Sequence, residues 1–477
     1  MDAVISTTSE FIENRTYDEV AVGDQASLSK TISQQDIDLF AVVSGDVNPA
    51  HMDPAYARTD MFHRIIAHGM LSAGLISSVL GTRLPGPGTI YLGQDLRFLR
   101  PVDIGDTITA SVIVKEKHPE KGDLVLECRC VNQSGEVVVT GTAHVRAPTE
   151  KVRRPRIELP SVRLSRHERF HAVIGEATAG SGPPVPTAIA HPCDPESVGA
   201  AVEAASAGLI EPILVGPKAT ILAAANTAKL DISAFRLVDT APHEAAAAAV
   251  GLVRKGEAAL LMKGSLHTDE LLHAVLEPGS GLSIGRRLSH VYLIDVPGYP
   301  RPLLITDAAV NIAPDLDQKR DIVQNAIDLA HVMGIQLPRV ALLSAVETVN
   351  PKIRSTLDAA ALCKMADRGQ ITGALVDGPL AFDNAISPAA AKEKGIVSEV
   401  AGRADILVVP DLEAGNMLAK QLTFLAGADA AGVVLGARIP IILTSRADAE
   451  RTRLASCAVA VLIARNRAAA AQKAAGV

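Results

Sequence analysis

Residues 65–84 are apolar or small at almost every position, and this constrains the fold of the chain more than any other feature. The spacing predicts a helix whose large apolar residues lie around its whole circumference: Ile65, Ile66, Met70, Leu71, Leu75, Ile76, Val79 and Leu80. A helix without a polar face has to be buried on all sides. The stretch Pro85-Gly-Pro-Gly88 then ends it.

Four strand-like runs follow this helix, at residues 89–98, 107–115, 124–131 and 136–146. The last two flank Asn132-Gln-Ser-Gly135, which has the composition of a hairpin turn. One buried helix followed by an antiparallel meander predicts a sheet wrapped around that helix. We therefore expect an α+β hotdog domain over residues 1–147.

The pattern changes after this first part. Residues 148–170 are charged and contain three prolines, which predicts a linker. From residue 171 to 477, alanine-rich helices alternate with short apolar strands, at residues 187–190, 212–215, 259–262, 291–296, 339–344, 373–377 and 406–409. Such alternation predicts an α/β domain with a largely parallel sheet. In such sheets ligands bind at the carboxyl ends of the strands, so chemistry is expected in the loops that follow them.

Composition limits the classes of function. A chain of 477 residues, 48% of them hydrophobic, can form two or three domains with sizeable cores. A net charge of −7 argues against a nucleic-acid partner. The five cysteines form no CxxC pair, the N-terminus has no signal-peptide pattern, and no long uninterrupted apolar run predicts a membrane span. We expect a cytoplasmic protein with reduced thiols and no membrane partner.

The stretch Ser-Gly-Asp-Val-Asn-Pro-Ala-His at residues 44–51 places a carboxylate and an imidazole on one short segment. Asp46 and His51 could share a water molecule, one acting as the base while the other donates or relays a proton. Asn48 could set the shape of the loop through a side-chain hydrogen bond. Gly69, near the start of the predicted helix, could offer its N–H to a developing oxyanion. The alternative is a capping aspartate beside an incidental histidine.

Three separated blocks carry a resemblance to a known family: AVVSGDVNPAHMDPAYA, AHGMLSAGLISSVLG and GTIYLGQDLRFLRPVDIGD. They resemble the MaoC-like, (R)-specific enoyl-CoA hydratases over about residues 15–147. The resemblance implies a dimeric hotdog fold, Asp46 and His51 as the hydratase dyad, and the Gly69 N–H as the donor to the thioester oxyanion. It also places Asn48 and Ser77 near the substrate.

Polar side chains follow several strands of the predicted α/β domain. They occur in the stretches 376–384, 409–420 and 443–448, and the candidate ligand-binding residues are Asp377, Asp411, Asn416, Ser445, Arg446 and Asp448. A guanidinium binds phosphate through two hydrogen bonds, a serine can donate to a reacting oxygen, and a carboxylate can accept a thiol proton. Each one alone could be a helix cap. Together they favour a ligand site.

The same part of the chain resembles the phosphate acetyl/butyryl transferases, over about residues 185–470. The matching stretches are GRRLSHVYLIDVP, ITDAAVNIAPDLDQKRDIVQNAI, LLSAVETVNPKI, VDGPLAFDNAIS, PDLEAGNMLAKQL and PIILTSRAD, closer in wording to the butyryl branch. The resemblance implies a two-subdomain α/β protein with its site in the cleft, direct acyl transfer between CoA and phosphate, and Ser445 with Arg446 as the catalytic pair.

Two positions depart from the acetyl branch of this family. By ungapped spacing, Thr452 stands where that branch has the aspartate that acts as base toward CoA, which leaves Asp448 and Glu450 as candidates. His273 stands where that branch has an arginine, so the phosphate site is expected to be less charged.

The two resemblances together predict a bifunctional acyl-CoA enzyme: an (R)-specific enoyl-CoA hydratase followed by a phosphate acetyl/butyryl transferase. Its expected substrates are acyl-CoA, CoA, phosphate and acyl phosphate, with no metal site, no cofactor beyond CoA as a substrate, and a homo-oligomeric state. The main alternative is a phosphate acyltransferase alone, with the hotdog part a non-catalytic acyl-CoA-binding or dimerisation module. A dehydrogenase lacks support because no glycine-rich dinucleotide fingerprint is present, and a hotdog thioesterase is a further alternative.

Overall fold

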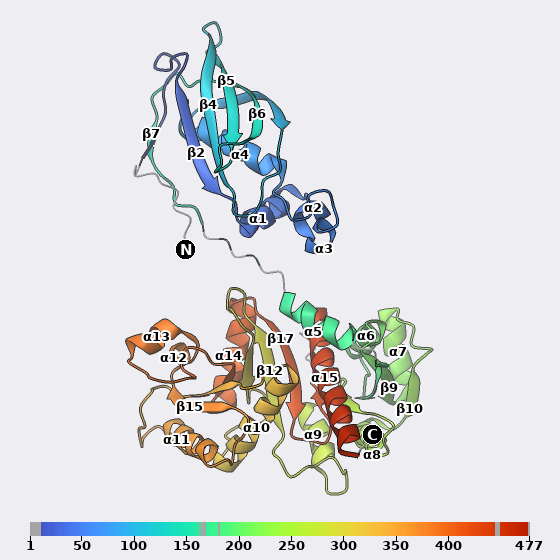
Figure 1. Cartoon of the computed structure of the whole chain (residues 1–477). Helices are drawn as coiled ribbons and strands as arrows, with labels where there is room; N and C mark the ends of the chain where they lie inside the picture. Colours follow the sequence, from blue (N-terminus) through green and yellow to red (C-terminus); the bar gives the residue numbers. More distant parts are fainter. Residues whose placement is uncertain are drawn as a thin grey trace. The chain divides into compact units, whose positions relative to one another are not determined.

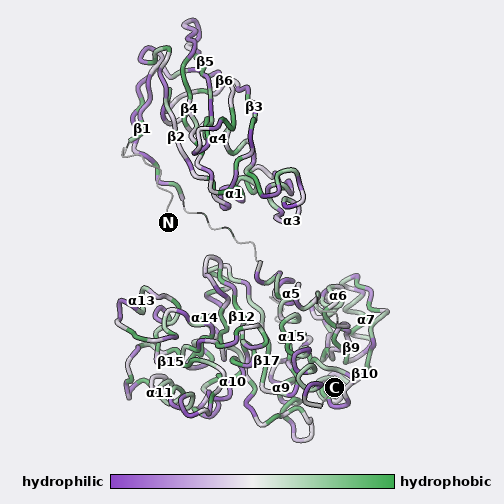
Figure 2. The backbone as a smooth tube through the Cα atoms, in the orientation of Figure 1, coloured by the Kyte–Doolittle hydropathy of each residue, from purple (hydrophilic) through white to green (hydrophobic). Residues whose placement is uncertain are grey.

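The computed structural model describes residues 11–160, 162, 164, 168–179, 182–443 and 449–475. The chain divides into two compact units, residues 1–164 and 165–477 (Figure 1). The division falls within the stretch 148–170. In both units, hydrophobic and hydrophilic residues intersperse along the backbone (Figure 2).

The first unit is a five-stranded antiparallel sheet folded around one long helix, which confirms the predicted hotdog architecture. The order across the sheet is β2 (Gln25–Thr31), β4 (Thr107–His118), β5 (Asp123–Val131), β6 (Val137–Arg146) and β3 (Ile90–Phe98). Helix α4 (Gly69–Thr82) packs into the concave face and contributes Leu75, Ile76, Val79 and Leu80 to the core. The prediction that it is buried on all sides is wrong, because Met70, Gly74, Ser77 and Gly81 form an exposed face made mostly of small residues.

Helix α4 begins four residues later than its apolar run predicts. The preceding residues are held in extended form instead, since the Ala67 N–H donates to the Val102 carbonyl at 2.8 Å and Ile66 forms a bridge with Asp103. At Ile66 and Ala67, backbone pairing with residues 102–103 therefore outweighs the helical spacing of the apolar residues.

Several elements of the first unit were not predicted. Three helices, α1 (Gln34–Ser44), α2 (Pro49–Met52) and α3 (Pro54–Ala57), connect β2 to the segment before α4. Strand β1 (Phe11–Glu13) pairs with β7 (Arg153–Pro155), so part of the expected linker belongs to the first unit. The Arg153 guanidinium lies over the Phe11 ring, 4.2 Å from its centroid.

The second unit contains an eleven-stranded mixed sheet. Its order is β10 (Arg236–Asp239), β9 (Ile210–Gly216), β8 (Val185–Ala190), β11 (Leu260–Lys263), β18 (Ile441–Ile442), β17 (Asp429–Leu435), β12 (Ser289–Asp295), β13 (Leu303–Thr306), β16 (Ile406–Val408), β14 (Arg339–Leu343) and β15 (Leu375–Leu380). The first five strands are mutually parallel, and so are the last four. The sheet is thus mostly parallel, as predicted.

The two parallel blocks run in opposite directions. Strands β17 and β12 lie between them, and the pairings of β18 with β17, β17 with β12 and β12 with β13 are all antiparallel. Consequently β18 ends at one edge of the sheet, whereas β13 and β16 end at the opposite edge.

Helices cover the faces of this sheet: α5 (Glu168–Ala179), α6 (Pro195–Ser206), α7 (Lys218–Ala228), the 3₁₀ turn η1 (Pro242–Glu244), α8 (Ala245–Arg254), α9 (Thr268–Leu276), α10 (Leu316–Val332), α11 (Arg354–Asp367), α12 (Phe382–Ile386), α13 (Pro388–Glu393), α14 (Leu412–Leu425) and α15 (Glu450–Ala475). Their apolar faces and the strands form one extensive core with two adjoining clusters.

Helix α15 bears on the expectation that the chain has no membrane span. Its residues Glu450–Lys473 are long and apolar enough to cross a membrane, by length and composition, and 44% of the most apolar window is buried. The helix packs against α5, α6 and β17. Arg453 pairs with Glu203 at 2.7 Å, and Arg465 donates to the Ala177 carbonyl at 2.6 Å. These contacts are those of a core helix of the second unit.

Candidate functional site

The segment that carries Asp46 and Asn48 is shaped by local hydrogen bonds. Helix α1 ends at Gly45, whose φ of 74° turns the chain sharply. The Asp46 carboxylate accepts from the Asn48 N–H at 3.2 Å, and the Asn48 side chain accepts from the Ala50 N–H at 3.1 Å, capping α2. Asn48 thus has the shaping role expected of it, and the Asp46 side chain is exposed.

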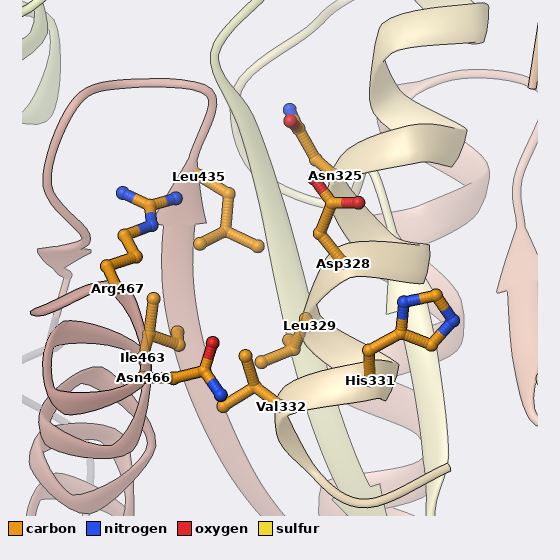
Figure 3. A pocket seen from close by; sticks show the side chains of 9 residues that line it. All are labelled: Asn325, Asp328, Leu329, His331, Val332, Leu435, Ile463, Asn466 and Arg467. Carbon is orange, nitrogen blue, oxygen red and sulfur yellow. The ribbon is translucent and has the colours of Figure 1, made fainter. Parts of the chain in front are cut away.

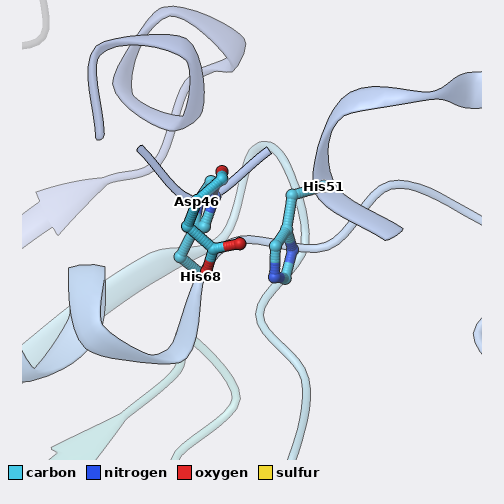
Figure 4. Close-up of side chains that lie close together, drawn as sticks. All are labelled: Asp46, His51 and His68. Atoms are coloured by element: carbon cyan, nitrogen blue, oxygen red, sulfur yellow. Dashed lines mark hydrogen bonds between the residues drawn. The ribbon is translucent and has the colours of Figure 1, made fainter. Parts of the chain in front are cut away.

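The structure brings Asp46 and His51 together with a third residue, His68. A carboxylate oxygen of Asp46 and one ring nitrogen from each histidine all lie within 4.8 Å of one another (Figure 4). His51 is half-buried on α2, and its Nδ1 lies 2.8 Å from the Ile66 carbonyl. Because a carbonyl only accepts, Nδ1 carries the hydrogen, and Nε2 keeps the lone pair that a general base needs.

His68 escaped the sequence analysis, although it stands directly before Gly69. Its side chain is 1% exposed, and its Nε2 lies 3.0 Å from the Asp46 main-chain carbonyl. The available signal was a histidine directly before the apolar run of the predicted helix. A side chain that turns inward at this position reaches the loop before α2.

Gly69 is the first residue of α4, as its expected role requires. The first N–H groups of a helix lack intrahelical acceptors and are available to an anion. A Cβ at this position would lie 3.0 Å from the Phe98 ring, so a larger residue would press against β3. Ser77 is exposed on the same helix, two turns further along.

In the second unit, a buried carboxylate organises the loop after β13. Asp307 is 3% exposed and accepts from the Ala309 and Val310 N–H groups at 2.9 and 3.0 Å. Its other oxygen accepts from the Asn311 N–H at 3.2 Å and from the Asn311 side chain at 2.5 Å. Four donors on one carboxylate compensate its burial and fix the loop.

Two of the predicted residues follow the neighbouring strand β16, and one of them, Asn416 on α14, contacts this loop. Asp411 caps α14 by accepting from the Ala414 N–H at 2.9 Å, and the Asn416 side chain donates to the Ala308 carbonyl at 3.3 Å. Sequence reasoning missed Arg287, whose Nε donates to the Asn311 side chain at 2.6 Å. It also missed Asp307, for which the stretch ITDAAVNIAPD, with an aspartate directly after an apolar strand, was the available signal.

The other predicted residues that the structure describes do not converge on this loop. Asp377 is half-buried within β15 and accepts from the Gly378 N–H at 2.8 Å. The His273 side chain is 81% exposed on α9 and lies 3.8 Å from the Glu277 carboxylate. Glu450 is exposed at the start of α15. Ser445, Arg446 and Asp448 lie outside the described residues.

The segments that follow β18 and β16 leave the sheet at opposite edges, because these two strands run in opposite directions. Leu443, which follows β18, lies at one edge of the sheet, and Asp411, which follows β16, lies at the other. A ligand that contacts both edges has to extend across several strands.

A hollow of about 330 Å³ between α10, β17 and α15 includes none of the predicted residues (Figure 3). Its lining includes Asp328, His331 and Arg467. Burial lowers the pKa of Arg467, and its guanidinium donates to the carbonyls of Ala437 and Arg438, both at 3.0 Å. The Arg467 guanidinium therefore binds the loop that joins β17 to β18.

His290 lies on β12 beside Thr306 and Asp307. It is 1% exposed, and its ring stands edge-on to Tyr292 at 4.3 Å between centroids. Burial lowers the pKa of His290 to about 4, although the Asp307 carboxylate acts in the opposite direction. The imidazole is accordingly neutral in the folded unit at neutral pH.

Two family models match this chain. The model for the MaoC like domain matches residues 20–129. The model for Phosphate acetyl/butaryl transferase matches residues 240–461. The matches fall in the first and second units respectively.

Relatives of known name match the second unit. A phosphate acetyltransferase of Rhizobium meliloti is 63% identical over 295 residues, covering 62% of this chain and 93% of the relative. A phosphate butyryltransferase of Clostridium acetobutylicum is 44% identical over 262 residues, covering 54% and 87%. The crystal structure of a branched-chain phosphotransacylase from Enterococcus faecalis is 32% identical, with a TM-score of 0.53, covering 59% of this chain and 99% of that one.

The buried state of His290 predicts an acid-sensitive second unit. An unfolded imidazole binds its proton near pH 6.5, whereas the folded one does so only near pH 4. Between these values the unfolded state binds more protons, so stability is fully present above about pH 6.5 and falls as the pH is lowered. The expected loss at pH 4 is up to roughly 3 kcal/mol. Denaturant unfolding of wild type and His290→Leu between pH 7 and 4 measures it.

The variant should show a shallower decrease in the free energy of unfolding than wild type. His243→Gln, at an exposed position, serves as the control and should follow the wild-type curve. Parallel curves for wild type and His290→Leu would contradict the prediction.

Proposed function

Because this chain belongs to the phosphate acetyl/butyryl transferase family and carries a MaoC-like domain ahead of its transferase unit, we propose that one polypeptide performs two reactions on acyl-CoA thioesters. The first unit hydrates short-chain 2-enoyl-CoA to the (R)-3-hydroxyacyl-CoA. The second transfers an acyl group reversibly between CoA and phosphate.

In the hydratase reaction, the dyad of Asp46 and His51 activates a water molecule. One member takes a proton from the water as its oxygen bonds to C3 of the enoyl group, and a proton is delivered to C2. Negative charge develops meanwhile on the thioester oxygen, where the N–H of Gly69 at the start of α4 can stabilise it. The observation that carries this proposal is the approach of the Asp46 and His51 donor atoms within 4.8 Å beside that helix terminus.

In the transferase reaction, phosphate attacks the thioester carbonyl, the carbon–sulfur bond breaks, and CoA leaves as acyl phosphate forms. We assign Ser445 and Arg446 to the reacting phosphate and carbonyl oxygens, on the resemblance of their motif. The 63% identity to a phosphate acetyltransferase, against 44% to a phosphate butyryltransferase, favours acetyl as the transferred group. The base toward CoA is assigned to Asp448 or Glu450.

Neither reaction requires a metal or redox cofactor, and CoA serves as a substrate. The five free cysteines suit a reducing compartment, which supports a cytoplasmic location.

We further propose that the chain forms a homo-oligomer through its first unit. Strand β3 is an edge of the five-stranded sheet, and an unpaired edge invites pairing with another chain. Apolar residues on this strand and directly after it are 40–55% exposed: Ile90, Tyr91, Leu92, Phe98 and Leu99. A second copy could cover both the edge and these side chains.

Substitution of either dyad member should abolish hydration and leave acyl transfer intact. Asp46→Asn or His51→Gln removes a proton-transfer group, so the hydration rate of crotonyl-CoA should fall by at least about 10²-fold. Phosphate-dependent cleavage of acetyl-CoA by the same variants serves as the internal control. A wild-type chain that transfers acetyl groups but does not hydrate crotonyl-CoA would support the alternative of a non-catalytic hotdog module.

Arg446 provides a test of the transferase assignment. If its guanidinium contacts phosphate through two hydrogen bonds, Arg446→Lys should not restore the activity lost in Arg446→Ala, because an ammonium cannot reproduce that geometry. Acetyl phosphate formation measures the effect, and crotonyl-CoA hydration controls for folding. Nearly full transfer rates in both variants would remove Arg446 from the site.

The oligomer proposal predicts that Leu92→Glu lowers the mass of the particle in solution or its stability to dilution. A charge on the β3 edge would have to be buried against the partner, at a cost of several kcal/mol. Light scattering after size exclusion measures the mass, and Leu357→Glu, exposed in the second unit, is the control. A wild-type chain that is monomeric at micromolar concentration would refute the proposal.

A further inference from the structure

Four consecutive residues before and at the start of α4, Ile66 to Gly69, hold both members of the proposed dyad and supply the oxyanion donor. The Ile66 carbonyl holds the His51 ring, His68 holds the Asp46 main chain, and Gly69 begins the helix. Ala67 anchors the segment by donating to the Val102 carbonyl at 2.8 Å. The relative positions of base, acid and oxyanion donor therefore depend on one short extended segment.

The hydrogen bond of His68 fixes its tautomer. Its Nε2 faces the Asp46 carbonyl at 3.0 Å, and since a carbonyl cannot donate, Nε2 carries the hydrogen. Its Nδ1 is buried and has no hydrogen-bond partner within the part of the chain that the structure describes. A buried polar atom without a partner costs free energy. That cost indicates a role for the His68 imidazole beyond the filling of space.

The His68 ring also packs against the ring of His51. Their centroids are 4.0 Å apart with planes inclined by 38°, and Phe40 lies on His68 with centroids at 4.9 Å. The tilted His68 ring therefore lies against the ring of His51 and supports it from one side.

We propose that His68 is a positioning residue of the hydratase, an inference that rests on the proposed function of the first unit. Its Nε2–H holds the main chain of Asp46, and its ring supports the face of His51. It thereby sets the separation between the carboxylate and the imidazole that share the water molecule. It does not touch the reacting atoms.

Three substitutions separate the hydrogen bond from the packing. His68→Phe keeps a ring against His51 but removes the donor, His68→Gln offers an amide N–H toward the Asp46 carbonyl, and His68→Ala removes both. The readouts are kcat and KM for crotonyl-CoA on the intact chain, with acetyl transfer as the internal control. Misplacement by about 1 Å can cost about 10²-fold, so kcat of His68→Phe should fall by that factor with KM nearly unchanged. His68→Gln should recover most of the loss.

Val79→Ala is the matched control for a purely structural role. Val79 is buried in α4, ten residues and about 15 Å along the helix from Gly69. This variant should lower the thermal midpoint of the first unit while leaving kcat unchanged. If His68→Phe behaves in the same way, or if Gln and Phe lose kcat equally, the positioning role is refuted while wild-type hydration still stands.

A second measurement does not depend on activity. Nitrogen-15 spectra of histidine-labelled protein distinguish the two imidazole tautomers, and His68 should appear with its hydrogen on Nε2. In Asp46→Asn, which keeps the main-chain carbonyl, that signal should persist. A hydrogen on Nδ1 of His68 would overturn the inference even if the first unit proved inactive.

Discussion

Burial of α4 is the constraint on which the first unit depends. Leu75, Ile76, Val79 and Leu80 are buried against the sheet, whereas Met70 and Ser77 lie on an exposed face of the helix. The sheet curls around the buried face, and the loop that carries Asp46 and His51 lies against the N-terminal end of the helix. The same end offers unsatisfied N–H groups. Core packing and the proposed chemistry therefore have one structural origin.

The second unit depends on a different device. Two strands, β17 and β12, separate two parallel blocks of opposite direction, and the buried Asp307 fixes the loop where one of those blocks ends. Its carboxylate is compensated by four donors, so the loop keeps its shape without a regular element. Arg287 reaches the same loop from the other side through Asn311.

The sequence predicted the elements well where one local pattern decides them. Four of the five hotdog strands, β3 to β6, and the central helix are predicted within a few residues, because alternation and apolar spacing are local properties, whereas β2 is not predicted. The start of α4 is not predicted either, because pairing of Ala67 with Val102 depends on a residue 35 positions away. The strand β7 was read as linker for the same reason: its partner is the N-terminal β1.

The site residues divide in a similar way. Asp46, His51 and Gly69 lie in two short polar or glycine-containing segments of the sequence, and in the structure they lie close together. His68 was not predicted because its role depends on the direction in which its side chain points, and the spacing of residues along the sequence does not show that direction. The direction of β18 relative to β16 was also hidden, since alternation of strands and helices does not encode the reversal at β17 and β12. Spacing along the sequence consequently does not reveal that β18 and β16 end at opposite edges of the sheet.

The pairing of β1 with β7 means that the polypeptide enters and leaves the hotdog unit at one place. Phe11 lies opposite Pro155, and Glu13 lies opposite Arg153. The two ends of this domain lie side by side, so the domain can be inserted into another protein, or removed from it, without disturbing its core. Joining this unit to a second folded unit therefore requires little change in either fold. The same closure makes this unit a natural subject for circular permutation or for transplantation onto other carriers.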